Sequence, residues 1–250
     1  MGGNQPEQDV IPAAEAESPV PAPPTVTVVV PVYNEADYLP AAIPALTDAL
    51  GQLEAEVRIL VVENGSTDGS ADIVRSFQAD HEQLDLLQLP TANYGAAIRA
   101  GFDAVRTDWA VVFDIDYFSG PFLAAALAER DRADLVIGSK RAPGSDDRRA
   151  PVRRMATWSL NTLLRVLVGL RVSDTHGMKA IRREVLDAVL ADVVSVDDLF
   201  DTEVVIRAER LGFRIVELPV VVEEQRESKS KIWHRVPRTL RGILRIRRSL

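Results

Sequence analysis

Cysteine is absent from this chain of 250 residues. Its absence excludes disulfide bonds, zinc–thiolate sites and a thiol nucleophile, and leaves the redox compartment undetermined. Long apolar runs are absent too: residues 163–172, interrupted by Arg165 and Arg171, fall well short of the ~20 apolar residues of a membrane-spanning helix. The first 24 residues have neither the basic nor the apolar region of a secretory signal. We therefore expect a cytoplasmic protein that is at most peripheral to the cytoplasmic face of a membrane.

Phosphate-binding glycine motifs are also missing. No GxGxxG follows the first predicted strand, and no GxxxxGK[ST] occurs anywhere in the chain. These absences argue against a Rossmann dehydrogenase and a P-loop nucleoside triphosphatase. Aromatic residues are few, at 6%, whereas apolar residues make up 46% of the chain. We therefore expect a core of Val, Leu, Ile and Ala in one domain of ordinary size.

Charge is unevenly distributed along the chain. The net charge is −8 and the isoelectric point is about 5.0, which argues against nucleic acid as a general partner. The end of the chain is nevertheless basic, and residues 232–250 are predicted to form a basic, amphipathic C-terminal helix. Such a helix either lies on an anionic bilayer or packs on the domain with its arginines in water, and both interpretations stay open.

The order of polar and apolar segments predicts one α/β domain. Residues 1–24 are rich in Pro, Ala, Glu and Gln without periodicity, which is typical of a disordered tail. From residue 25 to residue 231 strands alternate with helices, as in a mostly parallel, Rossmann-like sheet with helices on both faces. The predicted strands are 25–32, 57–62, 84–89, 109–113, 134–137 and 213–222, and the predicted helices are 36–50, 70–77, 96–105, 122–130, 155–168, 201–211 and 236–248. Pro219 makes the last strand an edge or bulged strand, and residues 141–151 are predicted to be a mobile loop.

Two carboxylates follow the fourth predicted strand, at Asp114 and Asp116. Ligands of such sheets bind beyond the carboxyl ends of the strands. Carboxylates two residues apart in a turn there can reach one hard cation, and Mg²⁺ and Mn²⁺ favour oxygen ligands completed by substrate phosphates. In isolation the pair would be read as a capping turn that holds backbone amides. Its place after this strand favours a metal site for a diphosphate.

The first two strands also end in polar segments. Residues 33–35 (Tyr-Asn-Glu) follow the first strand, and residues 63–70 (Glu-Asn-Gly-Ser-Thr-Asp-Gly-Ser) follow the second. Short polar side chains in such turns hydrogen-bond a base or ribose, or they cap the next helix, and the two roles are compatible.

Together these motifs carry a resemblance that covers roughly Val28 to Lys231. The chain resembles glycosyltransferase family 2, of the GT-A fold, and most of all its dolichyl-phosphate or polyprenyl-phosphate mannosyl- and glucosyltransferase branch. The matching segments are 28–35 (VVVPVYNE), 61–70 (VVENGSTDGS), 93–101 (NYGAAIRAG), 114–116 (DID), 138–141 (GSKR), 154–161, 174–179 (DTHGMK), Glu203 with 207–212 (RAERLG), and 230–231 (SK). Each motif alone is modest, whereas their joint order and spacing are specific.

The resemblance implies transfer of a hexose from a nucleotide-diphosphate sugar, of the GDP-mannose or UDP-glucose class, to a polyprenyl phosphate. It also implies Mg²⁺ or Mn²⁺ on the diphosphate, held by Asp114 and Asp116. The implied donor contacts are Pro31, Tyr33, Glu35, Glu63, Asp68, Asn93, Gly95 and Asp114. The implied phosphate and acceptor contacts are Arg141, Arg154, His176, Ser230 and Lys231.

Several residues depart from the family pattern. The branch often has a polar residue that joins the metal shell where this chain has Phe118, so water or Ser119 has to fill that place. The usual Thr-Ser-Gly-Phe-Arg is residues 175–179, Thr-His-Gly-Met-Lys, and the usual Leu-Ser-Arg has Thr157 and Trp158 in place of Ser-Arg. These changes cluster on the acceptor side, so the acceptor is the least certain part of the resemblance.

The identity of the acceptor decides whether a general base is needed. A lipid phosphate is already an anionic nucleophile, whereas a hydroxyl acceptor requires a nearby carboxylate. Asp197, Asp198, Asp201 and Glu203 are candidates, with Glu203 counted among the catalytic residues beside Asp114, Asp116 and Arg141. The other interpretation of these carboxylates is that they cap the helix that follows.

Three rival functions remain open on the sequence. A glycosyltransferase for a soluble metabolite or glycan would share the whole donor site. A catalytically silent nucleotide-sugar-binding protein is kept open by Phe118 and the altered acceptor segment. A sugar-nucleotide-forming nucleotidyltransferase is the weakest rival, since its first strand usually opens into a Gly-rich, basic loop.

Overall fold

The computed structural model describes residues 22–149, 151–175, 177–222 and 232–250. A seven-stranded sheet, ordered β3-β2-β1-β4-β7-β5-β8, forms its centre. Its strands are β1 (Thr25–Val32), β2 (Glu56–Asn64), β3 (Leu84–Leu89), β4 (Trp109–Val112), β5 (Leu135–Ser139), β7 (Lys179–Arg182) and β8 (Ile215–Pro219). The helices are α1 (Leu39–Gly51), α2 (Ser70–Gln78), α3 (Tyr94–Ala104), α4 (Gly120–Ala128), α5 (Pro151–Val168), α6 (Arg183–Val189), α7 (Phe200–Arg210) and α8 (Ile232–Ser249). A short 3₁₀ helix, Leu190–Asp192, follows α6.

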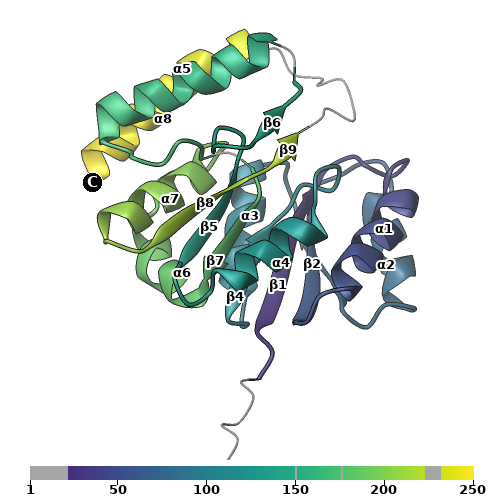
Figure 1. Cartoon of the computed structure of the whole chain (residues 1–250). Helices are drawn as coiled ribbons and strands as arrows, with labels where there is room; N and C mark the ends of the chain where they lie inside the picture. Colours follow the sequence, from purple (N-terminus) through teal and green to yellow (C-terminus); the bar gives the residue numbers. More distant parts are fainter. Residues whose placement is uncertain (1–21, 150, 176, 223–231) are drawn as a thin grey trace, which may run out of the picture.

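The sheet is mostly parallel and is covered on both faces, as the sequence predicts (Figure 1). Strand β1 shows why: Val28 and Val30 belong to one buried cluster and Val29 to the other. One cluster packs under α1, α2 and α4, and the other under α3, α6 and α7. A strand that is apolar on both faces is stable only between two such layers, because either side chain row would otherwise face water.

Strand β7 and helix α6 were not predicted. β7 runs antiparallel between β4 and β5 and makes the sheet mixed. The strand has only four residues, with Lys179 and Arg182 at its ends, so it shows neither the apolar run of a buried strand nor a helical period. Its conformation comes from pairing with two neighbours that are distant in sequence.

The boundaries of two predicted elements differ from the structure. Helix α1 begins at Leu39 instead of residue 36, because residues 36–38 turn back on the carbonyl of Glu35 and Pro40 lies in the first helical turn. The predicted strand 213–222 is divided into β8 and β9 (Val221–Val222). β8 is an edge strand that ends at Pro219, as predicted, and β9 pairs with β6 (Asp146–Asp147), inside the predicted loop 141–151.

Helices α5 and α8 lie side by side as an outer layer on the α7 side of the domain (Figure 1). The inner side of α8 is closely packed: Ile243 and Ile246 are fully buried, and a Cβ added at Gly242 would come within 2.5 Å of Leu199. Arg207 of α7 also donates to the Ser249 hydroxyl at 2.8 Å. The C-terminal helix therefore packs on the domain through one side. No helix in the part of the chain that the structure describes is long and apolar enough to span a membrane.

Candidate functional site

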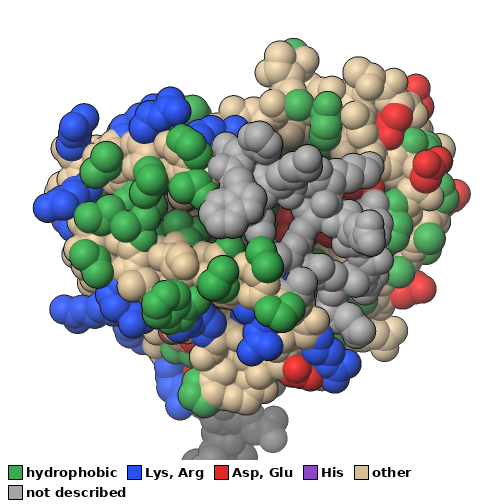
Figure 2. Space-filling model, turned by 90° about the horizontal axis from the view of Figure 1, so that it is seen from above, with side chains coloured by type: hydrophobic (Ala, Val, Ile, Leu, Met, Phe, Trp, Pro, Cys, Tyr) green, Lys and Arg blue, Asp and Glu red, His purple; other side chains and the backbone are tan. Residues whose placement is uncertain are grey.

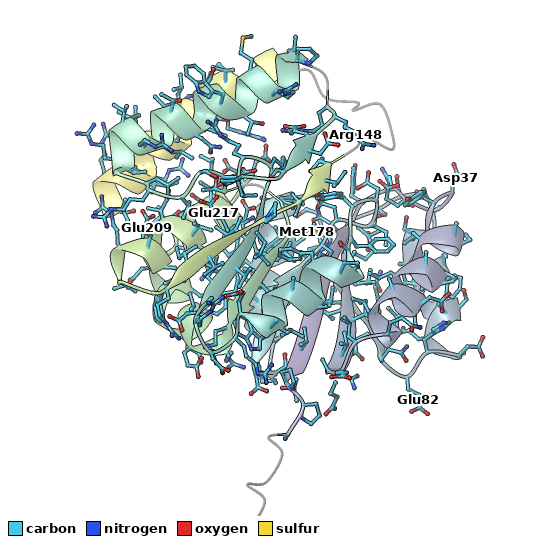
Figure 3. The ribbon with its side chains drawn as sticks, in the orientation of Figure 1. Asp37, Glu82, Arg148, Met178, Glu209 and Glu217 are labelled. Atoms are coloured by element: carbon cyan, nitrogen blue, oxygen red, sulfur yellow. The ribbon has the colours of Figure 1, made fainter. Side chains whose placement is uncertain are left out.

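The polar segments predicted from the sequence meet at one edge of the sheet. β2, β1 and β4 are neighbouring parallel strands, with Val32 of β1 beside Glu63 of β2. Their carboxyl ends therefore bring Tyr33, Glu63 and Asp114 to the same edge. Asp37 lies near this edge, and Glu82 lies at the opposite end of the molecule (Figure 3).

Asp68 ties the loop after β1 to the loop after β2. Its carboxylate accepts hydrogen bonds from the Ala36 amide at 3.0 Å, the Ser70 amide at 3.0 Å and the Ser70 hydroxyl at 2.6 Å. Desolvation raises the pKa of Asp68, but the bonds from Ser70 and Ala36 outweigh it, so the pKa lies below its usual value. Asp68, an implied donor contact, therefore supports the loop and also binds the first amide of α2.

A second set of bonds holds the two loops together. The Asn34 amide donates to the Ser66 hydroxyl at 2.9 Å, and the Thr67 amide donates to the Asn34 side chain at 2.9 Å. Asn34 itself has a φ of 52°, in the left-handed region that Asn tolerates better than most residues. The backbone here is thus fixed before any ligand binds. Tyr33, 48% exposed, projects from this support, whereas Pro31 is buried in β1.

The side chains of Glu63 and Asn93 accept hydrogen bonds from backbone amides in this structure. The buried Glu63 carboxylate accepts from the Ser66 amide at 2.5 Å. Asn64 accepts from the Asn93 amide at 2.8 Å, and the Asn93 side chain caps α3 through the Ala96 amide at 3.1 Å. These bonds join the end of β2 to the start of α3.

Gly95, in the first turn of α3, is required by close packing. A Cβ at this position would lie 2.3 Å from the Asp197 carbonyl oxygen. The start of α3 therefore rests directly on the backbone that precedes α7. This contact explains the glycine by packing, and the place of Gly95 beside the donor site stays a prediction.

Asp114 and Asp116 form a tight turn after β4. The Tyr117 amide donates to the Asp114 carbonyl at 3.0 Å, and the Tyr94 hydroxyl donates to the Asp114 carboxylate at 3.2 Å. Desolvation and the negative charge of Asp116 raise the pKa of Asp114. Two carboxylates that repel each other at a partly buried turn would be stabilised by a cation, so the residues present fit a divalent metal.

The rest of a metal shell would have to come from water and substrate. Among the described residues, no three His, Cys, Asp or Glu side chains are grouped to hold a metal. The Ser119 hydroxyl accepts from the Phe122 amide at 3.1 Å and so caps α4, while Phe118 packs against the core. A shell with few protein ligands suits Mg²⁺, which retains water and binds substrate phosphates.

Behind the carboxylate turn lies a buried ion pair. Lys179 of β7 is beside Val112 in the sheet, and its ammonium lies 2.6 Å from Asp201 and 3.0 Å from the Gly177 carbonyl. Both side chains are almost fully enclosed. Asp201 is therefore held by a cation inside the domain, and the positive charge of Lys179 favours ionised Asp114.

The structure does not support the predicted catalytic role of Glu203. Its fully buried carboxylate accepts from the amides of Val194 at 3.0 Å and Ser195 at 2.7 Å, and pairs with Arg207 at 2.7 Å. A carboxylate enclosed in this way holds a loop and has no open face toward an acceptor. The sequence could not exclude this role, because a polar segment at the start of a helix does not show that one of its carboxylates is buried.

The two carboxylates just before α7 also interact with other groups of the protein. Asp197 accepts from the Leu199 amide at 3.3 Å, and Asp198 pairs with Arg238 of α8. The helix-start interpretation fits Asp197, which accepts from the amide just before α7, whereas Asp198 pairs with an arginine of another helix.

The predicted arginines differ in exposure from Lys140, a neighbouring cation that is not among the predicted contacts. Arg141 and Arg154 are exposed, whereas the Lys140 ammonium is nearly enclosed, 3.4 Å from Asp174. Desolvation lowers the pKa of Lys140, and the charge of Asp174 opposes that shift. Both residues lie in a turn after β5, where neither a strand nor a helical period applies, so the motif 138–141 could not show which cation faces inward. His176, Ser230 and Lys231 lie outside the described residues.

The loop that contains Asp174 is held in place by hydrogen bonds to β8. Glu217 of β8 accepts from the Ser173 amide at 2.9 Å, the Ser173 hydroxyl at 2.6 Å and the Asp174 amide at 3.2 Å. Ser139 is hydrogen-bonded to Ser173 at 2.9 Å. The segments around Lys140 and Asp174 are thereby held together as one unit.

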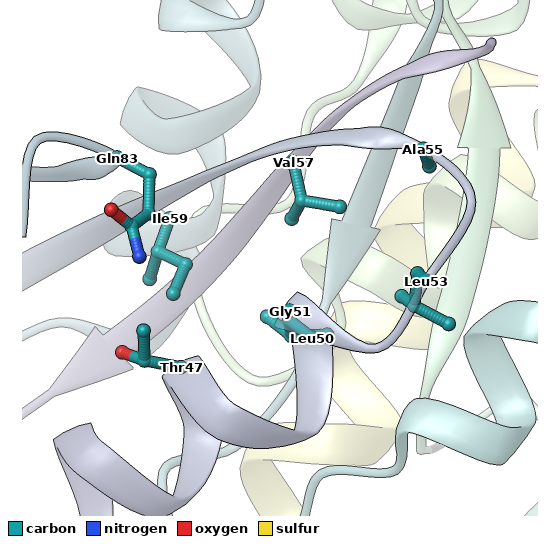
Figure 4. Close-up of a pocket in the computed structure, with 8 residues that line it drawn as sticks. All are labelled: Thr47, Leu50, Gly51, Leu53, Ala55, Val57, Ile59 and Gln83. Atoms are coloured by element: carbon teal, nitrogen blue, oxygen red, sulfur yellow. The ribbon is translucent and has the colours of Figure 1, made fainter.

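An apolar pocket elsewhere in the molecule is separate from this site (Figure 4). It lies between α1 and the first half of β2, so it is at the amino ends of the strands. Its lining residues are Thr47, Leu50, Gly51, Leu53, Ala55, Val57, Ile59 and Gln83. No ionisable side chain lines it, so it offers nothing that would bind a diphosphate or a metal.

Comparison with known proteins identifies the family of this chain. Residues 27–190 match the model of the glycosyl transferase family 2. The undecaprenyl-phosphate mannosyltransferase of Micrococcus luteus is 33% identical over 215 residues, 83% of this chain and 87% of that protein. The polyprenol monophosphomannose synthase of Mycolicibacterium smegmatis is 34% identical over 215 residues, 82% of this chain and 80% of that protein.

The fold also matches a solved enzyme. The crystal structure of glucosyl-3-phosphoglycerate synthase from Mycobacterium tuberculosis, in complex with Mn²⁺, UDP-glucose and phosphoglyceric acid, superposes with a TM-score of 0.65. The identity is 20%, and the match covers 90% of this chain and 80% of that one. With the family model, the two relatives and the mostly parallel sheet in agreement, the chain belongs to glycosyltransferase family 2 and is a glycosyltransferase.

Proposed function

We propose that this enzyme transfers a hexose from a nucleoside-diphosphate sugar, of the GDP-mannose or UDP-glucose class, to a polyprenyl phosphate. The observation that carries the proposal is the turn of Asp114 and Asp116 beside the braced loops after β1 and β2. Two relatives at 33% and 34% identity, named for undecaprenyl-phosphate and polyprenol-phosphate mannose transfer, support the acceptor class.

The donor would lie across the carboxyl edge of β2, β1 and β4. Tyr33 is exposed there for the base or ribose, on a loop whose backbone Asp68 and Ser66 hold in place. Asp114 and Asp116 would hold a divalent cation, Mg²⁺ or Mn²⁺, which would neutralise charge on the departing diphosphate. Crystal structures of glucosyl-3-phosphoglycerate synthase that contain Mn²⁺ or Mg²⁺ with UDP support metal use in this fold.

Lys140 would supply a further positive charge on the phosphate side. Its partner Asp174 is fully buried and fixed by Glu217, so the ammonium is held in one place before the substrate arrives. A preorganised cation stabilises developing charge more effectively than a mobile one.

A phosphate acceptor fits the ion pairs of three candidate bases in the described part of the chain, Asp198, Asp201 and Glu203. In the transfer an oxygen of the lipid phosphate bonds to the anomeric carbon, and the bond from that carbon to the diphosphate oxygen breaks. The acceptor is already an anion, so no proton has to be removed. Asp201, Glu203 and Asp198 are each paired with a cation within the protein, which suits such a reaction better than a hydroxyl acceptor.

Transfer of labelled sugar into a chloroform-soluble product tests the proposal. The assay pairs each donor with a polyprenyl phosphate in detergent and Mg²⁺ or Mn²⁺, beside soluble acceptors such as a phosphorylated metabolite. Lipid-linked label that depends on the polyprenyl phosphate is expected. Efficient transfer to a soluble acceptor with none to the lipid would refute the acceptor class but retain the donor site. No turnover of any donor would leave only nucleotide-sugar binding.

A further inference from the structure

The outer faces of α5 and α8 form one apolar surface. Within the described part of the chain, twelve large hydrophobic side chains are exposed, and seven of them lie on these two helices. They are Val152, Met155, Trp158 and Val166 on α5, and Val236, Leu240 and Leu244 on α8. We call this set the α5/α8 surface.

The exposed residues follow helical spacing, so each helix contributes a stripe. Met155, Trp158 and Val166 recur on one side of α5, and their exposed fractions are 58%, 55% and 75%. On α8, Leu240 and Leu244 are 40% and 44% exposed, one turn apart. The inner sides of both helices are already occupied, by Leu164 and Val168 on α5 and by Ile243 and Ile246 on α8. The stripes are thus a second apolar side on helices that are already packed.

The charge around this surface has a single sign. α5 contains three arginines and α8 six, and neither helix contains an acidic residue. The chain as a whole nevertheless has a net charge of −8. In the view from above, apolar side chains form a patch bordered by Lys and Arg, and most of the visible acidic side chains lie on the opposite side (Figure 2).

We infer that the α5/α8 surface docks this enzyme on an anionic lipid bilayer, with the apolar stripes in the interfacial layer and the arginines on lipid phosphates. Amphipathic helices with aromatic and aliphatic side chains on one side and arginines beside them bind in this way. The inference rests on the proposed function and deepens it, because a polyprenyl phosphate is taken from a membrane.

The surface is built into the fold, unlike a C-terminal helix that folds only on lipid. Gly242 meets Leu199, and Arg207 bonds Ser249, so α8 is fixed in place beside α5. A preformed surface loses little conformational entropy on docking. It also sets the orientation of the enzyme on the membrane, because α5 follows directly on the segment that contains Lys140 and β6.

Co-sedimentation with vesicles that contain no polyprenyl phosphate tests the inference apart from catalysis. The whole chain is mixed with phosphatidylglycerol/phosphatidylcholine vesicles or pure phosphatidylcholine vesicles. The variants are the pair Val152→Ser/Val166→Ser, the pair Arg241→Gln/Arg245→Gln, and two controls. Leu211→Ser removes a hydrophobic side chain that is 61% exposed off the surface, and Arg132→Gln removes an exposed arginine beyond α4.

Wild type and both controls are expected to bind the anionic vesicles alike, and less in high salt. The serine pair should weaken binding at least tenfold, and the arginine pair about fivefold per arginine, from about 1 kcal/mol each. Thermal unfolding and sugar transfer in detergent, where no bilayer is present, should stay at wild-type values for all variants.

Equal binding of wild type and the serine pair would overturn the inference, as would equal binding to neutral vesicles. A serine pair that turns a dimer into a monomer would also overturn it and would assign the surface to a second copy. If transfer to the lipid phosphate fails in detergent while vesicle binding behaves as expected, the proposed function fails and the docking surface stands.

Discussion

Replacement of Glu203 separates a structural carboxylate from a catalytic one. Glu203→Leu removes the acceptor of the Val194 and Ser195 amides and leaves Arg207, whose side chain is 10% exposed, without its partner. Leaving a buried ion-pair partner alone costs about 3–5 kcal/mol. For a chain of this size each kcal/mol lowers the melting temperature by roughly 2–4 °C, so a fall on the order of 10 °C is expected.

The double variant Glu203→Leu/Arg207→Leu should lose less than the sum of the two single losses, because the unpaired charge is removed with its partner. Thermal unfolding followed by circular dichroism measures these losses, and kcat is measured at a temperature where every variant is folded. Glu203→Gln, which keeps the size of the side chain, should retain kcat within a few-fold. A Glu203→Gln enzyme of unchanged stability whose kcat falls a hundredfold would refute this reasoning and make Glu203 a catalytic base.

Three further predictions concern the support of the site. Gly95→Ala should lower stability by about 1–3 kcal/mol, because the added methyl meets backbone, whereas Gly51→Ala meets nothing and should not; chemical denaturation compares them. The pKa of Asp68 is lowered in the fold, so its ionised form contributes stability above the unfolded pKa that is lost as the pH falls through the folded pKa. Asp68→Asn should therefore be less stable than wild type at pH 7, and the difference should shrink as the pH falls below the unfolded pKa. Lys140→Met should raise the donor KM or lower kcat by about tenfold or more, whereas Arg141→Met should change neither more than a few-fold, as steady-state kinetics would show.

The sequence predicts those parts of this fold that local pattern determines. The run 25–32 could only be a strand covered on both faces, and the polar ends of β1, β2 and β4 had to meet at one edge once the sheet was parallel. The turn of Asp114 and Asp116 followed from the same logic. In each case the residues of one segment are enough to predict its secondary structure and its position in the sheet.

Other features depend on contacts between distant segments. β7 is short and charged at both ends, so only its pairing with β4 and β5 makes it a strand. Glu203 and Arg207 are spaced as an exposed helical ion pair would be, and only the covering loop at Val194 and Ser195 makes them internal. Which of two adjacent cations turns inward at residues 140–141 depends on Asp174, far along the chain.

Mn²⁺ binding in the presence of a nucleoside diphosphate tests the central claim, the metal–diphosphate site at the carboxyl edge of the sheet. Electron paramagnetic resonance of free Mn²⁺ is read for wild type, Asp116→Asn and the control Asp103→Asn, an exposed carboxylate on α3. Wild type and control should deplete free Mn²⁺ equally when GDP or UDP is present, and Asp116→Asn should deplete it at least tenfold less effectively. Binding by Asp116→Asn that equals wild type would contradict the account.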